Sequence, residues 1–350
     1  MEIVRREEIM RILDDYDEKD ITIGTIGSHS ALQILHGARQ EGFRTLVICL
    51  KGVEELYERF GVADDILTVN NYREMISDEF QEMLRSRNVI LIPHGSFVEY
   101  LSAEGIASMR TPIFGNRKVL EWESDRGKQR EWLAAAGIKM PMSFERSDEI
   151  DRLVIVKLHG AKGGSSYFIA SSPEELKQKL RDIDNAYEIQ EYIIGTRFYP
   201  HYFHSFVRNR TELLGIDIRY ESNIDGLARI TSVVTEKIEP SFVVTGNIPV
   251  VARESLLLKI LHVGDGVVSA SRSLFSGGIV GPFCVELVCT DTLELFAFEI
   301  SARIVAGTNL YINGSPYSQI LFNESMSTGR RIAIEIKEAI RMNMLHQIVY

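Results

Sequence analysis

Cysteine and long apolar runs are scarce in this sequence. Cys49, Cys284 and Cys289 are its three cysteines, and they form neither a CxxC pair nor an even set, so we expect buried, reduced thiols and no structural zinc. No apolar run approaches the roughly 20 residues that span a bilayer. The N-terminal segment mixes both charges where a signal peptide needs an apolar core. We therefore expect a cytoplasmic protein with no membrane partner.

Basic residues are also in the minority. The chain of 350 residues has 39 lysines and arginines against 49 acidic residues, and its formal net charge is -10. Because no basic cluster could follow a phosphate backbone, we expect no nucleic-acid partner. With 45% hydrophobic residues, the chain is long enough for two or three domains, each with its own core.

The N-terminal third alternates between short β-branched segments and segments with helical periodicity. The β-branched segments cover residues 21–27, 44–50, 64–69 and 88–96. The helical spacing covers residues 7–16, 31–42, 53–60 and 72–87. This alternation predicts an α/β domain with a parallel sheet and helices on both faces. Glycines and serines follow the first and last strands, where open α/β sheets bind ligands, so one side of a substrate pocket is expected there.

A different pattern begins near residue 120. Residues 111–116 predict a last short strand, and residues 117–141 predict one long amphipathic helix. The later apolar segments are longer and adjacent, which predicts an α+β arrangement with antiparallel strands, including a hairpin around residues 290–292. We place the domains at residues 1–120, 121–200 and 201–350.

Lys157 ends the apolar segment VIVK and precedes the glycine-rich segment HGAKGGSS. A strand lysine beside such a loop can hold triphosphate charge while loop amides approach the phosphates. The pattern GxxxxGK[ST] is absent, and a plain hairpin turn explains the glycines about as well. Glu191 interrupts a later segment, EIQEYII, whose backbone can face an adenine edge while the carboxylate is free for the sugar or amino group. An edge strand with one solvated glutamate is the alternative.

Two glutamates form the strongest candidate site. Glu286 in FCVELV and Glu299 in FAFEISARI interrupt the apolar strands of the expected hairpin. Buried carboxylates are costly without a partner, and hard oxygen ligands suit Mg²⁺ bound to ATP phosphates. Because strand side chains alternate, Glu299, Ser301 and Arg303 should share one face and point at the same phosphates. The alternative is a buried glutamate–arginine ion pair, which adds little stability, so we favour the metal site.

Weaker candidates lie elsewhere. Asn309 can complete a coordination shell or belong to a simple turn. His29 lies at a strand-to-helix junction, where helix N–H groups favour an anion such as a nucleotide 5′-phosphate, although capping by Ser28 explains that serine equally well. We discount His201 and His204 as a metal pair, because residues three apart on a strand face opposite sides.

The order of these features resembles the ATP-grasp superfamily. More specifically, segments over nearly the whole chain are similar to the archaeal formate-dependent 5-formaminoimidazole-4-carboxamide ribonucleotide (FAICAR) synthetase family. They include IGSHSALQILHGA, IPHGSF, FGNRKVLEWESDR, GAKGG, IQEYIIGT, IDIRYESNIDG, TGNIPVVARESLL, GPFCVE and FEISARIVAGTNLYINGSPYS.

This resemblance implies a preATP-grasp-like α/β domain followed by a two-lobed ATP-grasp fold. It also implies an ADP-forming ligase of purine (IMP) biosynthesis. Such an enzyme uses ATP and formate to formylate 5-aminoimidazole-4-carboxamide ribonucleotide (AICAR) through formyl phosphate. The family tends to form symmetric oligomers, so a homo-oligomer is expected.

The resemblance also assigns roles to individual residues. Lys157 and Arg303 would be catalytic, and Glu286 and Glu299 would hold Mg²⁺ or Mn²⁺. The nucleotide contacts would be Lys157, Gly163, Gly164, Glu191, Tyr192, Ile193 and Glu221. The AICAR contacts would be His29, Ser96 and Asn247. Nothing in the residue patterns themselves singles out Asn247 or Glu221.

Departures from the family pattern keep two alternatives open. Residues 163–166 read GGSS, without the basic residue and the further glycine of relatives, and the run after Arg229 and the segment 180–188 also differ. The chain could therefore be a paralogous ligase that joins another carboxylate and amine, or a nucleotide-binding paralogue without turnover. Retention of Glu286, Glu299 and Arg303 favours an enzyme.

Overall fold

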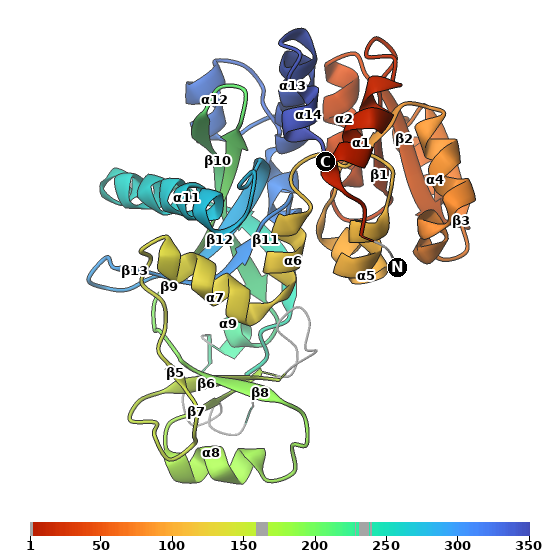
Figure 1. Ribbon diagram of the computed structural model, residues 1–350. Coiled ribbons are helices and arrows are strands. Elements are labelled where there is room, and N and C mark those ends of the chain that lie inside the picture. Colours follow the sequence, from red (N-terminus) through yellow and green to blue (C-terminus); the bar gives the residue numbers. More distant parts are fainter. Residues whose placement is uncertain (1–2, 159–166, 228, 231–237, 239) are drawn as a thin grey trace.

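The computed structural model describes every residue except 1–2, 159–166, 228, 231–237 and 239. Its strands form a parallel sheet of four strands, a smaller antiparallel sheet of four strands and an antiparallel sheet of five strands. Figure 1 shows the parallel sheet at one end of the molecule, the small sheet at the other, and the five-stranded sheet between them. The predicted combination of α/β and α+β architecture is confirmed.

The N-terminal parallel sheet has the strand order β3-β2-β1-β4. Its strands are β1 (Thr22–Ile26), β2 (Arg44–Leu50), β3 (Asp65–Val69) and β4 (Val89–Leu91). Every residue of β1 is buried, as expected for a strand of a parallel sheet that is covered on both faces. The surrounding helices are α1 (Arg6–Asp14), α2 (Ala31–Gln40), α3 (Glu54–Phe60), the 3₁₀ helix η1 (Tyr72–Ile76), α4 (Asp78–Arg85) and α5 (Gly95–Ser108).

Two local predictions for this region are wrong. Residues 72–87 are two helices rather than one, because Ser77 adopts an extended backbone and its hydroxyl accepts a hydrogen bond from the Phe80 amide, which starts α4 anew. Residues 111–116 are described throughout but contain no regular strand. Instead, Ile113 pairs with Leu91 through an isolated bridge.

The long helix predicted over residues 117–141 is also wrong. The chain forms α6 (Lys118–Ser124) and α7 (Arg126–Ala135), with Asp125 between them in an extended conformation. The Asp125 carboxylate accepts a hydrogen bond of 3.0 Å from the Lys128 amide, so it caps α7 as aspartate commonly does. The break lets α7 pack against the five-stranded part of the molecule, where the Trp132 indole donates to the Val267 carbonyl.

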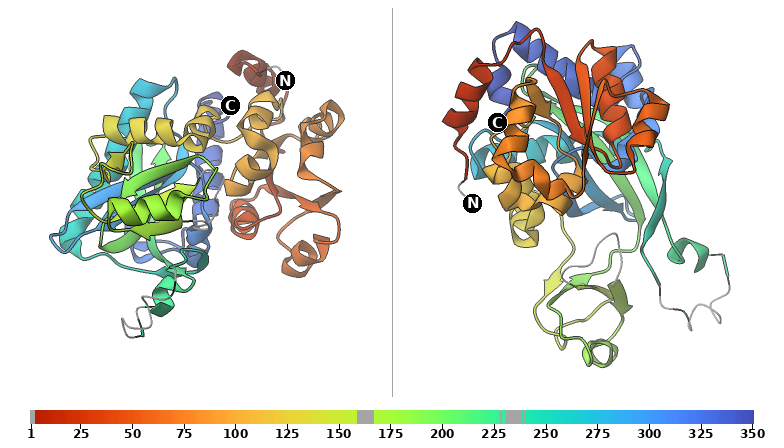
Figure 2. Two further views of the ribbon diagram at one scale, coloured as in Figure 1. Left: turned by 90° about the horizontal axis from the view of Figure 1, so that it is seen from below. Right: turned by 90° about the vertical axis from the view of Figure 1, so that its right-hand side faces the viewer.

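The small sheet has the strand order β5-β8-β6-β7 and packs on a single helix, α8 (Pro173–Leu180). Its strands are β5 (Ser143–Phe144), β6 (Val154–Leu158), β7 (Tyr167–Ala170) and β8 (Tyr187–Glu191). Leu176 of α8 and Ile189 of β8 belong to its small core. Figure 2 shows this lobe projecting from the rest of the molecule, at the end away from the parallel sheet. Because β8 lies between β5 and β6, the alternative of an edge strand at Glu191 is wrong.

The five-stranded sheet has the order β11-β10-β9-β12-β13, and all of its neighbouring strands are antiparallel. Its strands are β9 (Thr196–Ser205), β10 (Arg210–Glu221), β11 (Val244–Pro249), β12 (Gly281–Cys289) and β13 (Leu295–Ser301), and the short helix α9 (Ile224–Leu227) follows β10. The predicted hairpin is confirmed as β12 and β13, and Glu286 lies directly opposite Glu299 in its register.

One face of this sheet is covered by α11 (Glu254–Leu274), a helix of 21 residues that we did not predict. Its buried positions, which include Leu256, Ile260, Val263 and Val267, follow the spacing of one helix face, so the signal was present in the sequence. Tyr202 of β9 donates to the Ile260 carbonyl from this face, which leaves the opposite face of the sheet for a ligand. None of the described helices is long and apolar enough to cross a membrane.

The C-terminal helices return to the N-terminal sheet. They are the 3₁₀ helix η2 (Ala306–Tyr311), α12 (Pro316–Phe322), α13 (Thr328–Arg341) and α14 (Leu345–Ile348). Figure 1 shows α13 and α14 beside α1 and α2. Gly37 of α2 and Gly329 of α13 lie at their contact, where a Cβ atom on either would meet the backbone of the other helix. Ile34 and Ile336 share one core across this contact.

We predict that Gly37→Ala destabilises the protein, because the new methyl group would meet the backbone at Arg330. Overpacking of this kind costs about 1–3 kcal/mol in unfolding free energy. Gly226→Ala in α9 is the matched control, since a Cβ there has nothing within 4 Å. Urea unfolding of both variants measures the effect. A Gly37→Ala variant as stable as the control would show that the two helices can separate without loss.

Candidate active site

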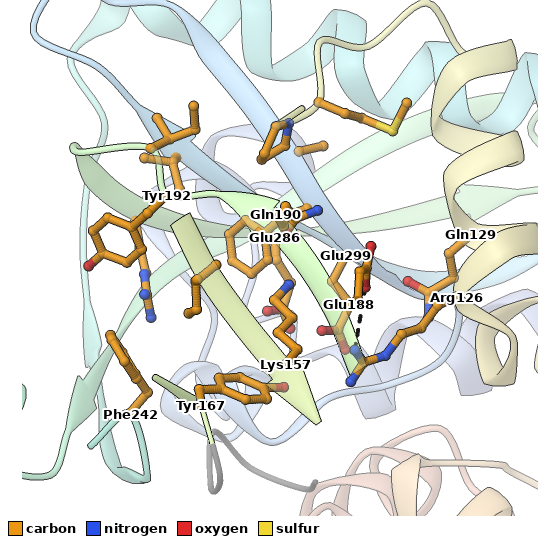
Figure 3. Close-up of a pocket in the computed structure, with 18 of the residues that line it drawn as sticks. Arg126, Gln129, Lys157, Tyr167, Glu188, Gln190, Tyr192, Phe242, Glu286 and Glu299 are labelled. Atoms are coloured by element: carbon orange, nitrogen blue, oxygen red, sulfur yellow. Dashed lines mark hydrogen bonds and ion pairs between the residues drawn. The ribbon is translucent and has the colours of Figure 1, made fainter. Parts of the chain in front are cut away.

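A cleft of about 380 Å³ lies between the small sheet and the five-stranded sheet. This volume is within the range of small-molecule binding pockets. Figure 3 shows its lining side chains converging from both sheets and from α7. The predicted residues that line it are Lys157, Glu191, Tyr192, Ile193, Glu221, Glu286 and Glu299. Gly163 and Gly164 lie outside the described residues.

The two predicted metal ligands face each other on β12 and β13. Glu286 is buried, and Glu299 is partly buried at the bottom of the cleft. Loss of solvation, together with the charge of Glu286, raises the pKa of Glu299 to about 7, although Lys157 and Arg219 oppose this shift. Two carboxylates in this position repel each other unless a cation or a proton lies between them.

The donor set fits a hard divalent cation that also binds phosphate. Among the residues that the structure describes, no three His, Cys, Asp or Glu side chains lie close enough to hold a metal by themselves. Mg²⁺ commonly binds through one or two carboxylates and completes its shell with substrate phosphates and water. Glu286 and Glu299 could supply those carboxylates, and the remaining ligands would then come from phosphate and water.

Glu286 also forms a glutamate–arginine ion pair, which we considered above as the alternative to a metal site. Arg219 of β10 donates to its Oε2 at 3.1 Å and, through Nη2, to its Oε1. The guanidinium lies over the Tyr199 ring with its central carbon 3.9 Å from the ring centroid. A carboxylate has about four lone-pair sites, so Glu286 can accept from Arg219 and still coordinate a cation.

Lys157 reaches the cleft from β6, on the opposite lobe. Figure 3 shows its side chain pointing toward Glu286 and Glu299, and its ammonium lies 5.5 Å from the centre of the Phe298 ring. Loss of solvation lowers the pKa of Lys157, while the nearby Glu299 and Glu188 oppose that shift. Glu188 and Arg126 form an ion pair of 3.4 Å beside it, which we did not predict. The alternation of Glu188 with Gln190 along β8 was the available signal.

The prediction of a free carboxylate at Glu191 is wrong. Its side chain accepts hydrogen bonds of 3.1 Å from Arg152 and from the Met142 amide. The Glu191 and Tyr192 amides donate to backbone carbonyls at 2.7 and 2.9 Å. These two amides are therefore occupied, so an adenine edge would meet other backbone groups of this segment. Glu221 pairs with Arg197 on the neighbouring strand.

The prediction that Arg303 shares the cleft with Glu299 is wrong, because Arg303 is not among the residues that line the cleft. Strand β13 ends at Ser301, and Arg303 then turns toward the N-terminal domain. Its Nη2 lies 2.8 Å from Oε1 of Glu123, a cleft residue of α6 that the sequence did not reveal. Arg303 and His29 both lie 3.2 Å from the position of a Cβ on Gly95, so glycine gives them room.

The predicted AICAR contacts His29 and Ser96 lie at the starts of α2 and α5. The place where these two helix starts meet Arg303 is called the seam below. The Ser96 hydroxyl lies 2.7 Å from that of Ser28. Burial, reinforced by the charge of Arg303, lowers the pKa of His29 to about 4, so its imidazole is neutral at pH 7. Two helix N-termini, two hydroxyls and a guanidinium are therefore close together, and these groups suit an anionic ligand.

Asn247 of β11 lies beside Asp217 of β10, which packs against Gly307 of η2. Its side-chain amide donates to Oδ2 of Asp217 at 2.6 Å, and Oδ1 of Asp217 lies 2.7 Å from Nε2 of His201. Asn309, considered above as a metal ligand, instead donates to the His29 carbonyl and accepts from Gln33 at 2.8 Å. Helix η2 therefore joins the two sides of the seam.

His201 and His204 have separate partners, as their opposite faces on β9 require. Nε2 of His204 lies 3.1 Å from Nη2 of Arg272 on the helical side of the sheet. All three cysteines are buried and free.

Comparisons with known proteins decide the family. The chain is 51% identical over 360 residues to the 5-formaminoimidazole-4-carboxamide-1-(beta)-D-ribofuranosyl 5′-monophosphate synthetase of Methanosarcina acetivorans, with 99% of this chain and 100% of the relative covered. The chain belongs to this synthetase family. Residues 23–144 match a family model described as a protein of unknown function (DUF1246), and residues 173–350 match a domain of unknown function (DUF1297).

Solved structures agree with this synthetase family. An IMP biosynthesis protein PurP from Thermococcus kodakaraensis has a TM-score of 0.77 and 30% identity, with 94% of this chain and 100% of that chain covered. An N5-carboxyaminoimidazole synthetase from Staphylococcus aureus, complexed with ADP, shares the fold at a TM-score of 0.62 and 17% identity, with coverage of 85% and 74%. The predicted FAICAR synthetase resemblance and the ATP-grasp type of fold are confirmed.

We predict that Glu299→Gln stabilises the ligand-free protein at neutral and alkaline pH. Because the folded state raises the pKa of Glu299 from 4.5 to about 7, the stability that its proton supplies is complete below pH 4.5 and is lost as the pH rises through 7. The variant should therefore match the parent protein near pH 4.5 and exceed it by about 3 kcal/mol at pH 8. Urea unfolding at pH 4.5, 6, 7 and 8 checks this.

Glu286→Gln is the control for that experiment. It removes the charge that holds Arg219, so it should destabilise the protein throughout this pH range. Added MgADP should favour the parent over Glu299→Gln, because a bound cation stabilises the charged carboxylate. A Glu299→Gln variant that is less stable than the parent at pH 8 without ligand would contradict the proposed repulsion.

Proposed function

We propose that this chain joins formate to the amine of AICAR, with ATP cleaved to ADP and phosphate. The observation that carries the proposal is the connection between the cleft and the seam. Glu123 lines the cleft and holds Arg303, and Arg303 adjoins His29 across Gly95. A nucleotide with its metal and a phosphorylated ribonucleotide would thus meet around one arginine. The full-length similarity to synthetases of this name supports the choice of substrates.

The reaction would take place in two steps. A formate oxygen attacks the γ-phosphorus of ATP, and the bond from that phosphorus to the β–γ bridging oxygen breaks, giving formyl phosphate and ADP. The amine nitrogen of AICAR then attacks the formyl carbon, the bond from that carbon to the phosphate oxygen breaks, and one proton leaves the nitrogen. Water must be excluded while formyl phosphate exists, because it would hydrolyse the acyl phosphate.

Residues from both lobes would contribute to these two steps. Lys157 would hold the phosphates from the small lobe, and Arg303 would offset charge that develops on the reacting oxygens. A divalent cation on Glu286 and Glu299 would supply neutralisation of the triphosphate charge. Arg197 and Glu221 lie at the nucleotide end, where Tyr192 and Phe242 add aromatic surface to the cleft.

His29, Ser96 and Asn247 would bind the ribonucleotide at the seam. The neutral imidazole of His29 can donate a hydrogen bond from a ring nitrogen, but it carries no charge that would attract the phosphate of the ribonucleotide. The attraction of that phosphate would therefore depend on Arg303 and on the helix N-termini. The substrates are phosphorylated metabolites, so we place the reaction in the cytoplasm. We also expect a homo-oligomer, as in the family that the chain resembles.

We predict that the purified protein with Mg²⁺, ATP, formate and AICAR releases ADP and formylated ribonucleotide in equal amounts. ADP release should depend on formate, because formate is the attacking group of the first step. The formylated product should depend on both formate and AICAR, because AICAR captures the formyl group in the second step. Chromatography of the two products against time measures this. Release of ADP that ignores formate, or a product formed equally well from another carboxylate, would reject formate as the substrate.

We predict that Lys157→Met lowers kcat about 10²–10³-fold, which is the usual effect of removing one positioned charge-bearing donor from the reacting group. Lys177→Met is the matched control, because Lys177 is exposed on α8 of the same lobe. Steady-state kinetics at saturating ATP separates this effect from weaker binding. Equal kcat values in the two variants would remove Lys157 from the catalytic residues.

A further inference from the structure

Strand β10 directs three charged side chains toward the ligand face of the five-stranded sheet. They are Asp217, Arg219 and Glu221, which alternate along the strand and therefore share one face. Each has a partner on β9: Asp217 bonds to His201, Arg219 stacks on Tyr199, and Glu221 pairs with Arg197. The row runs from Asp217, which packs against Gly307 of η2, to Glu221 in the lining of the cleft, and Arg219 lies in its middle.

The guanidinium of Arg219 is held in place but not covered. Two of its N–H groups bind Glu286, and the Tyr199 ring supports its flat face. The Arg219 side chain keeps 25% of its surface exposed, whereas Glu286 keeps 4%. A ligand in the cleft would therefore meet the arginine rather than the carboxylate of this pair. Arginine has five donors, and Glu286 occupies only two of them.

Arg219 lies between the proposed cation ligands and Asn247, a proposed contact of the ribonucleotide. Arg219 is the direct register partner of Asn247 on the neighbouring strand β11, and we proposed Asn247 as a contact of the ribonucleotide. Through Glu286 it also adjoins the carboxylates that would hold the cation. A group that is transferred from the nucleotide to a molecule at the seam must pass between these two places. A buried glutamate–arginine pair contributes little to stability by itself, so a stabilising role alone does not explain its position.

We propose that Arg219 is a further catalytic residue, which donates hydrogen bonds to the phosphoryl group in transfer. When a cation shares the Glu286 carboxylate, the pairing of that carboxylate with Arg219 weakens, and the planar guanidinium can turn an edge toward two phosphoryl oxygens. Tyr199 keeps the guanidinium plane fixed as this happens. The identity of the molecule that accepts the phosphoryl group rests on the proposed function. The contact between Arg219 and the phosphoryl group does not.

Nucleotide titrations test this contact without any turnover. Calorimetric titration with Mg²⁺ and either ADP or the β,γ-imido analogue of ATP compares ligands that differ only by the terminal phosphoryl group. Arg219→Met should weaken binding of the analogue at least 10-fold and change ADP affinity less than 3-fold, because the lost donors face that group alone. Arg219→Lys, which keeps the charge, should recover part of the loss.

Arg197→Met is the matched control. Arg197 also pairs with a cleft glutamate and has the same 25% side-chain exposure, but it lies at the other end of the row. It should weaken ADP and the analogue by the same factor. In the complete assay, Arg219→Met should lower kcat about 100-fold at saturating Mg²⁺. Thermal unfolding followed by circular dichroism verifies the fold, and if Arg219→Met is unfolded, Arg219→Lys carries the comparison.

Two results would overturn the proposal. One is an equal loss of affinity for ADP and the analogue in the Arg219 variants. The other is normal kcat at saturating Mg²⁺, which would mean that Arg219 only holds Glu286. If the parent protein fails to formylate AICAR but Arg219→Met still loses the analogue selectively, the proposed substrates are wrong while the phosphoryl contact stands.

Discussion

The repulsion between Glu286 and Glu299 is the constraint on which the other features of the cleft depend. Their strands are paired in direct register, so the two carboxylates cannot separate without breaking the β12–β13 hairpin. Arg219 compensates one of them from the same sheet, and Lys157 approaches from the opposite lobe. The folded chain thus keeps two adjacent carboxylates in the cleft of an already acidic protein. Binding of a cation with its nucleotide would turn that unfavourable arrangement into a favourable one.

In the proposed reaction, the seam would bring a second anion, the ribonucleotide, next to this site. Arg303 leaves the strand that carries Glu299 and crosses to the N-terminal domain, where Gly95 has no side chain to obstruct it. An ion pair joins Arg303 to Glu123, which lines the cleft. One short stretch of chain after β13 therefore spans the distance between the two binding regions, and the rigid helix starts at His29 and Ser96 fix its far end.

Sequence patterns predicted the repeating architecture and the acidic hairpin because these depend on local periodicity. The positions of Lys157, Glu286 and Glu299 followed from single polar residues in apolar strands. The failures arise where tertiary contacts override the local signal. Asp125 breaks a helix whose periodicity continues through it, and Glu191 is engaged by Arg152, a residue far away in the sequence. Arg219 was visible as an alternating charge on β10, but nothing local indicates that Glu286 would be its partner.

The contact between α2 and α13 has a consequence for how the protein matures on the ribosome. One face of α2, including Ile34 and Ala38, is covered by residues near the C-terminus, such as Ile336. The N-terminal sheet therefore emerges from the exit tunnel long before its last covering helix exists. Until α13 has been translated, that nascent layer presents a bare apolar surface, so a fragment that stops after the first domain should associate with chaperones rather than persist as an independent unit.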